Sequence, residues 1–385
     1  MGGGFVARRE AGRAGQAGIG VLALLAGSLG PLAVRGQTEA EGIAPGSGRA
    51  LFEARCATCH GADGRGAPGR VAFAIELPDF TDCRFAAREP DADWLAVIHQ
   101  GGPARGFSPI MPAHGASLSE AQLAAILSHL RAFCGDPRWP RGELNLPRPL
   151  VTEKAFPEDE AVVSALANAN REGEVATELL FEKRLGARSQ VELSLPIGAR
   201  EEPGPGDSWN AGVGDVGVGA KHAFFHSHSW GSVASLGGEV KFPSGDKGDG
   251  LGKGTVLFEP YLAVGQILPR DSFLQLQALG EIPADRDVAD EVQLRAALGT
   301  SFEPRRFGPV ISPLLEVIGS WAFAAGGVDA GWELVPQVQV PLNVRQHVRL
   351  NVGVRVPVSD TGRRPIRAGF TLLWDWFDGG LLDGW

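Results

Sequence analysis

Sulfur is scarce in this sequence. Its 385 residues include two methionines and four cysteines. Met1 would leave with an export signal, so Met111 would be the one methionine of the mature chain. Two cysteines, Cys56 and Cys59, belong to a single short motif, which leaves Cys83 and Cys134 to be explained separately.

Clustered positive charge and long apolar runs are also lacking. The formal net charge is -9 and the isoelectric point is near 5.5. No basic stripe appears, which argues against a nucleic-acid partner. No apolar run of helix-spanning length comes after the first 36 residues. If the mature chain crosses a membrane, it must therefore cross as a closed barrel.

The N-terminus has the pattern of an export signal. Arg8, Arg9 and Arg13 precede an apolar run over Ile19–Val34. This order is typical of a secretory signal peptide, which we place at residues 1–36. A retained anchor and a twin-arginine signal, based on the Arg8-Arg9 pair, are the alternatives.

Export would place the two remaining cysteines in an oxidising compartment. Disulfides form and persist in oxidising compartments. Cys83 and Cys134 are therefore candidates for a disulfide, with two buried free thiols as the alternative.

The most informative motif is Cys56-Ala57-Thr58-Cys59-His60. Two thiols three positions apart and followed by histidine are typical of c-type haem attachment. Each thiol can bond one vinyl group of the haem, and His60 would be the proximal iron ligand. A redox CxxC and half of a zinc site are the alternatives.

Met111 offers a second axial ligand. It lies between Pro109 and Pro112, which favour an extended segment. A helix is predicted after Ser117, with apolar residues at helical spacing. These are Leu123, Ile126, Leu127, Leu130 and Phe133. Gap-filling in a core is the alternative role for Met111, and the alternative iron ligands are His99, His114 and His129.

The order of helix, CxxCH, loops, methionine and final helix resembles a class I cytochrome c over Gly46 to Asp136. The resemblance implies an all-α domain, about residues 46–136, with one covalent haem c. It implies that Cys56 and Cys59 hold the haem, with His60 proximal and Met111 distal on the iron. Thioether ligation would raise the reduction potential.

The next segment, residues 137–173, is rich in proline and charge. We predict a linker there, extended or irregular, that lets the haem domain reach far from the next domain. A short helix is expected over residues 161–169.

From Glu174 onward the apolar period changes to two. Over Gln346–Ser359, valine and leucine alternate with polar residues. Several such runs of about 11 to 15 residues exceed the usual strand and suit a bilayer crossing. We predict a transmembrane antiparallel β-barrel of about 12 strands over residues 174–385, with a soluble β-sandwich as the alternative. Leu350, Val352, Val354 and Val356 should face lipid, and Arg349 and Arg355 the lumen.

Two stretches of this half carry a further resemblance. Residues 212–221 and 241–246, of sequence GVGDVGVGAK and KFPSGD, are similar to the channel-like family first associated with meta-pathway phenol degradation. That resemblance implies an outer-membrane barrel. The overall plan is similar to cytochrome–porin fusions of iron-oxidising bacteria, although their haem segment is much shorter.

Together these features predict a multidomain protein with a single haem. We expect it to transfer electrons at the periplasmic face of the outer membrane, anchored by its barrel, with periplasmic redox proteins and outer-membrane lipid as partners. The alternative is a channel for a small solute with the cytochrome as redox partner or sensor. An enzyme is not expected, because two filled axial positions leave no open site on the iron.

Overall fold

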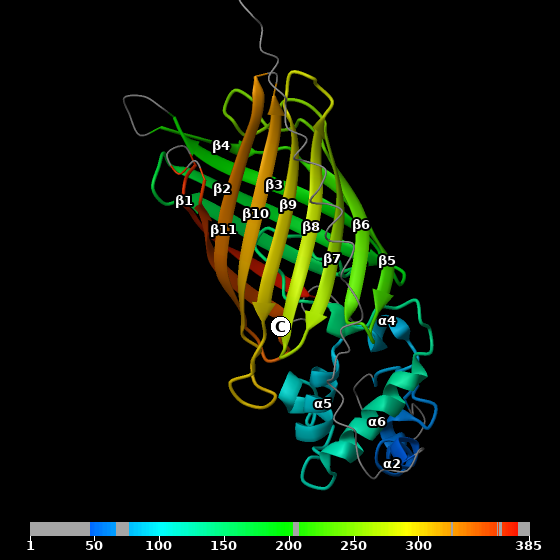
Figure 1. Ribbon diagram of the computed structural model, residues 1–385. Helices are drawn as coiled ribbons and strands as arrows, with labels where there is room; N and C mark the ends of the chain where they lie inside the picture. Colours follow the sequence, from blue (N-terminus) through cyan, green and yellow to red (C-terminus); the bar gives the residue numbers. More distant parts are fainter. Residues whose placement is uncertain are drawn as a thin grey trace, which may run out of the picture. The chain divides into compact units, whose positions relative to one another are not determined.

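The computed structural model describes residues 47–66, 77–202, 208–324, 326–359, 361 and 364–375. All helices in these ranges lie between Ser47 and Leu144. The predicted signal peptide lies outside these residues. The helices are α2 (Ser47–Arg55), α3 (Ala57–His60), α4 (Cys83–Ala86), α5 (Asp91–Gln100) and α6 (Glu120–Phe133), with 3-10 turns η1 (Gly102–Arg105) and η2 (Gly142–Leu144) (Figure 1). No helix within the described ranges is long and apolar enough to cross a bilayer.

Helix α6 forms where its sequence predicts a start. Ser119 accepts a hydrogen bond from the Gln122 backbone, and the Gln122 side chain accepts one from the Ser119 backbone, which completes a capping box. The predicted apolar face is buried at Leu123, Ile126, Leu127 and Leu130, where it packs with residues such as Phe52 and Trp94. This core fixes the helices that carry the haem motif.

A disulfide joins Cys83 to Cys134, with their Cα atoms 5.1 Å apart. Cys83 begins α4 and Cys134 caps the end of α6. The bond closes a loop over a sequence separation of 51 residues. It thus ties a segment downstream of the haem motif to the last helix of the domain.

Removing this bond should destabilise the haem domain. We expect Cys83→Ser with Cys134→Ser to cost roughly 2–5 kcal/mol of unfolding free energy, because the unfolded chain regains loop entropy. Denaturant titration followed by haem absorbance measures the loss. Mass mapping of the exported wild type is the control, and finding both thiols alkylated without reductant would contradict the pairing.

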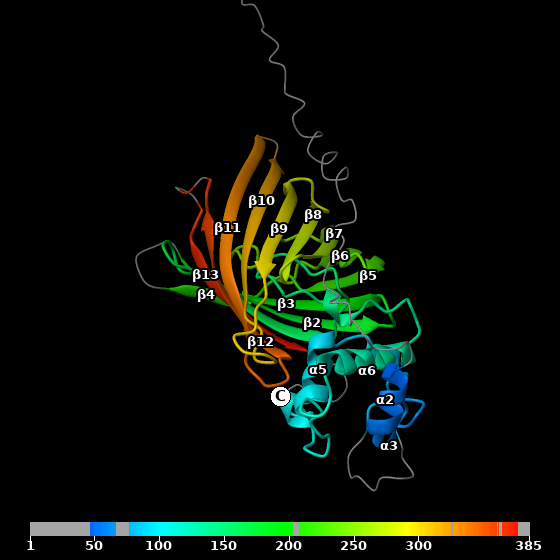
Figure 2. The same cartoon turned by 60° about the horizontal axis from the view of Figure 1, so that its bottom comes forward.

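Strands make up the second half. They are β1 (Glu160–Asn168), β2 (Glu174–Leu185), β3 (Ser189–Glu201), β4 (Trp209–Val213), β5 (Gly217–Ser227), β6 (Ser232–Lys241), β7 (Leu257–Leu268), β8 (Ser272–Pro283), β9 (Asp290–Thr300), β10 (Ser312–Ala324), β11 (Gly327–Pro341), β12 (Val348–Pro357) and β13 (Arg367–Asp375). Each strand pairs antiparallel with its neighbours, and β1 pairs with both β2 and β13, which closes the ring. Figure 2 shows β2 and β3 facing β7–β11 across the interior.

The strand number agrees with the prediction of about 12. Both β4 and β5 pair with β3, each along a different part of it, so they act as one interrupted strand. Counted in this way, the described residues form a closed twelve-stranded antiparallel barrel. The predicted fold class, a helical cytochrome c-like domain followed by such a barrel, is confirmed.

The two faces of β12 also match the predicted pattern. Val352 and Val354 are exposed on the outer face, whereas Asn351 is buried inside. Arg355 points inward to an ion pair with Glu333. Exposed large apolar side chains recur on the outside of the other strands, which is the surface expected of a barrel in lipid.

A charge on this outer face should be costly. Val352, 42% exposed, lies at the middle of β12, so Val352→Arg should cost about 2–4 kcal/mol of folding free energy in a bilayer. Folding titrations into lipid vesicles measure this. Val358→Arg, beyond the end of the strand, is the matched control and should cost much less; equal costs for the two variants would contradict a lipid-facing position for Val352.

The barrel begins earlier than the sequence predicts. Glu160–Asn168 is strand β1, inside the segment predicted as a linker, and the helix expected at 161–169 is absent from it. Ladders with β2 and β13 on both sides outweigh the helix preference of its alanines. The residues just before β1 are also wrongly predicted: most of residues 144–159 are buried among inward-facing barrel side chains.

Candidate haem-binding site

The CxxCH motif forms one helical turn. α2 ends with the Cys56 amide donating to the Phe52 carbonyl, at 2.8 Å. The His60 amide then donates to the Cys56 carbonyl, at 2.9 Å. This turn brings Cys56, Cys59 and His60 together, and both thiols are free and half-buried.

The surroundings of Cys56 and His60 favour their uncharged forms. Burial, followed by the charge of Cys59, raises the pKa of the Cys56 thiol to about 11. Burial lowers the pKa of His60, which favours the neutral imidazole that an iron ligand requires. Within the described residues, the buried Nδ1 of His60 has no hydrogen-bond partner.

Aromatic side chains line the neighbourhood of His60. The rings of Phe80 and His60 lie 5.0 Å apart, and Phe80 also contacts Trp94, Phe85 and Phe133. Such an apolar wall suits the macrocycle of a haem and would limit the access of water to its iron. Two free thiols, a neutral imidazole and an aromatic wall together fit a covalent haem c.

Met111 lies on a separate segment that is fixed to the end of α5. Its carbonyl accepts a hydrogen bond from the Gly102 amide at 3.1 Å, and its amide donates to Ser108 at 3.2 Å. A Cβ at Gly102 would lie 2.2 Å from the Ser108 carbonyl oxygen and 3.2 Å from the Met111 Cβ. The close approach therefore requires glycine. Met111 is half-buried, and its role as iron ligand stays a prediction.

The alternative histidines have other surroundings. The Nε2 of His99 lies 3.8 Å from Glu120, and its ring packs 5.1 Å from Phe307. The ring of His129 lies edge-on to Phe133 at 4.9 Å, and likewise contacts Phe52. His114 is half-buried, and burial lowers its pKa. The first two rings are thus engaged in packing contacts.

Sequence reasoning missed Phe80 and Gly102. An aromatic residue among charged and polar neighbours in Pro78-Asp79-Phe80-Thr81-Asp82 was the available signal for the first. Gly102, the first residue of η1, could be recognised only with knowledge of where the Met111 segment packs.

Comparisons with known proteins agree with these domains. Residues 44–130 match the family model described as cytochrome c oxidase, cbb3-type, subunit III. No curated protein matches the chain. Among solved structures, an outer-membrane channel from Pseudomonas putida F1 is similar at 15% identity and TM-score 0.43, with 60% of this chain and 100% of that chain covered.

Two porins are also similar. The KdgM porin shares 10% identity at TM-score 0.36, covering 56% of this chain and 99% of its own. The NanC porin shares 9% identity at TM-score 0.39, covering 56% of this chain and 98% of its own. The chain therefore carries a cytochrome c domain at residues 44–130, followed by a twelve-stranded barrel that resembles outer-membrane channels.

Proposed function

We propose that this protein is a single-haem electron carrier at the periplasmic face of the outer membrane, held there by its barrel. The observation that carries the proposal is the turn over Cys56–His60, with two free thiols and a buried imidazole, in a cytochrome c domain. Haem c, when bound, supplies reversible one-electron chemistry. Cys56 and Cys59 would hold it, His60 and Met111 would ligate the iron, and Phe80 would exclude water.

An electron carrier fits better than an enzyme. Filling both axial positions with His60 and Met111 leaves no open position for a substrate. Periplasmic redox proteins are the proposed partners. Phe107 and Ile110, 48% and 47% exposed beside Met111, supply an apolar surface for such transient contacts.

The barrel supports an orientation with the haem domain in the periplasm. The start of β1 and the end of β13 lie at the same end of the barrel, since Glu160 pairs with Asp375. At that end the connections over residues 186–188, 228–231 and 269–271 are short, and a longer one over residues 301–311 joins β9 to β10. At the opposite end, β6 and β7 are joined by residues 242–256. Outer-membrane barrels have short periplasmic turns and longer extracellular loops.

Reconstitution in lipid vesicles tests the proposal. The full chain is inserted into vesicles that enclose ferricyanide, and a membrane-impermeant reductant is added outside. We expect the haem of outward-facing molecules to be reduced while the enclosed ferricyanide keeps its colour. The variant with Cys56→Ala and Cys59→Ala is the control for haem. Rapid bleaching of ferricyanide by the wild type alone would instead indicate electron conduction across the membrane.

A further inference from the structure

The residues that precede β1 lie inside the barrel. Leu144, Leu146, Arg148, Thr152, Lys154, Ala155, Phe156, Glu158 and Asp159 are all buried. We call residues 144–159 the lumen segment. Proline and charge are frequent in it, so burial of this kind needs a partner for each polar group.

Inward-facing barrel side chains supply partners for its backbone. Glu316 of β10 accepts hydrogen bonds from the amides of Val151 and Thr152, at 3.2 and 2.8 Å. Gln337 of β11 accepts from the Leu150 amide at 2.9 Å. Further bonds come from Arg184, Gln190, Lys221, Ser235, Gln275, Gln277, Arg295 and Asn351, so side chains of nine of the twelve strands bond to the backbone of the segment.

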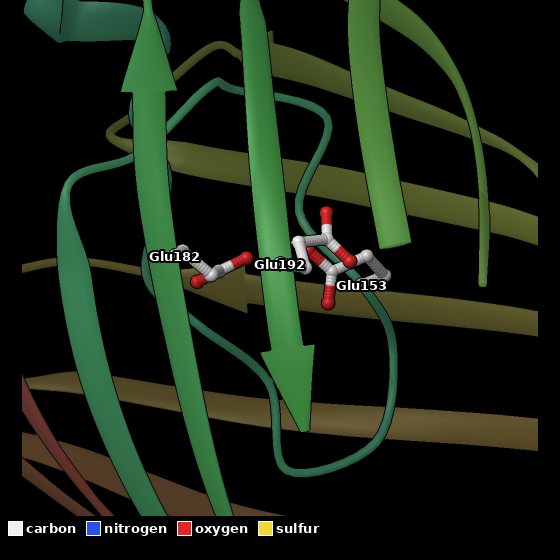
Figure 3. A group of neighbouring side chains, drawn as sticks. All are labelled: Glu153, Glu182 and Glu192. Carbon is white, nitrogen blue, oxygen red and sulfur yellow. The ribbon is translucent and has the colours of Figure 1, made fainter. Parts of the chain in front are cut away.

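Charge pairs also fasten the lumen segment. Figure 3 shows Glu153 of the segment beside Glu182 of β2 and Glu192 of β3. Lys221 Nζ lies 2.8 Å from Glu153, and Arg148 Nη2 lies 3.0 Å from the same carboxylate. Arg148 Nη1 reaches Glu182 at 2.7 Å. These cations pair with two of the three carboxylates, and Glu192 accepts hydrogen bonds from Gln190 and Tyr261, so we assign no metal ion to the group.

Apolar contacts fill the remaining space around the segment. Leu144 and Phe156 pack in one cluster with residues of β5–β8, such as Ala223 and Tyr261. Leu146 packs with Phe273 and Leu314 on β8 and β10. The segment thus contacts several sides of the barrel wall. A segment that only passed along one side of the lumen would not make all of these contacts.

The depth of these contacts shows which part of the lumen is filled. Gln275, Glu316 and Asn351 are the fourth or fifth residues of their strands, counted from the end where β1 begins. Beyond the segment lies a cavity of about 170 Å³ whose lining includes Val151 and Glu153 of the segment. Its other lining residues include Lys241, the last of β6. This cavity therefore ends on the lumen segment.

We infer that residues 144–159 are a resident plug that closes the barrel to solutes, so that the barrel serves as an anchor and not as an open channel. This inference does not depend on the proposed electron transfer, because it concerns the barrel alone. It decides against the alternative of a solute channel. The lumen wall carries glutamine and asparagine where their amide groups bond to the backbone of the plug. A wall that faced only water would not require these particular side chains.

Cross-linking tests where the plug lies. Thr152 Oγ1 donates to Glu316 Oε2 at 2.6 Å, so Thr152→Cys with Glu316→Cys in the full chain should be joined by a short bifunctional thiol reagent in outer membranes. Thr152→Cys with Leu315→Cys is the matched control, since Leu315 is next in sequence but exposed on the outer face. We expect linkage in the first pair and little in the second.

Conductance tests whether the plug closes the pore. The purified wild-type chain, reconstituted in planar bilayers, should show no steady ohmic channel. Glu316→Ala with Gln337→Ala removes the acceptors of three plug amides and should produce steady openings several-fold above the background current of the wild type. Absence of the specific cross-link, or a steady ohmic conductance in the wild type, would overturn the inference. Steady openings of the double-alanine variant under the same conditions show that the protein inserts, so a silent wild type is not mistaken for a protein that failed to insert.

Discussion

Met111→Ala should lower the reduction potential by a sizeable part of the ~0.8 V range over which axial ligands tune haem iron. A thioether stabilises Fe(II), and its loss leaves water or a stronger donor in its place. The haem should stay attached, because Cys56 and Cys59 are unchanged. Potentiometric titration gives the potential, and the weak near-infrared band of sulfur-ligated ferric iron should disappear.

The neighbouring residue supplies the control for this variant. Ile110 precedes Met111 and is exposed, so Ile110→Ala should leave both the potential and the band nearly unchanged. If Met111→Ala also leaves them unchanged, the distal ligand is another residue. His114, three positions away on the same segment, would then be the next to substitute.

Arg148→Met should destabilise the folded barrel by about 3–5 kcal/mol, since it leaves buried carboxylates without their cation. Arg148 is 7% exposed and forms ion pairs with Glu153, Glu160 and Glu182. Methionine keeps much of the side-chain volume, which limits any cavity effect. Urea titration of the protein in lipid vesicles, read by the heat-dependent shift on gels, measures the loss.

Arg138→Met is the matched control for charge removal. Arg138 pairs with Asp136 at 2.8 Å, but its side chain is 74% exposed, and exposed pairs contribute little. A similar loss of stability in both variants would mean that net charge, and not the buried network of Arg148, explains the effect.

Much of the fold could be predicted from the sequence because its signals are local. The capping residues of α6 and its apolar period predict that helix, and the strict alternation over Val348–Pro357 predicts the faces of β12. The haem turn is equally local, since three residues within five positions define it. Such signals need no knowledge of distant parts of the chain.

The lumen segment could not be predicted in this way. A stretch with several prolines and charges resembles a solvated linker, because composition does not show that a polar barrel interior can replace water. The alanines of β1 gave the wrong element for a similar reason, as only pairing with β13 makes them a strand.

The haem domain is therefore harder to separate from the barrel than it would be if a long flexible linker joined the two. Residues 137–159 do not form a flexible tether, because most of residues 144–159 are fixed in the barrel. Arg88 of the haem domain also forms an ion pair with Asp159, at the end of the plug. A fragment ending near Asp136 would lose that partner, so its stability and its potential need to be compared with those of the full chain.

Asp159 and Glu160 are adjacent, so a single peptide bond separates the plug from the first strand. The pairing of β1 with β13, the last strand of the described chain, closes the ring around residues that precede it. We expect the upstream segment to be positioned before that seam forms. The filled lumen of each inserted molecule would then reflect where residues 144–159 lay when the ring closed.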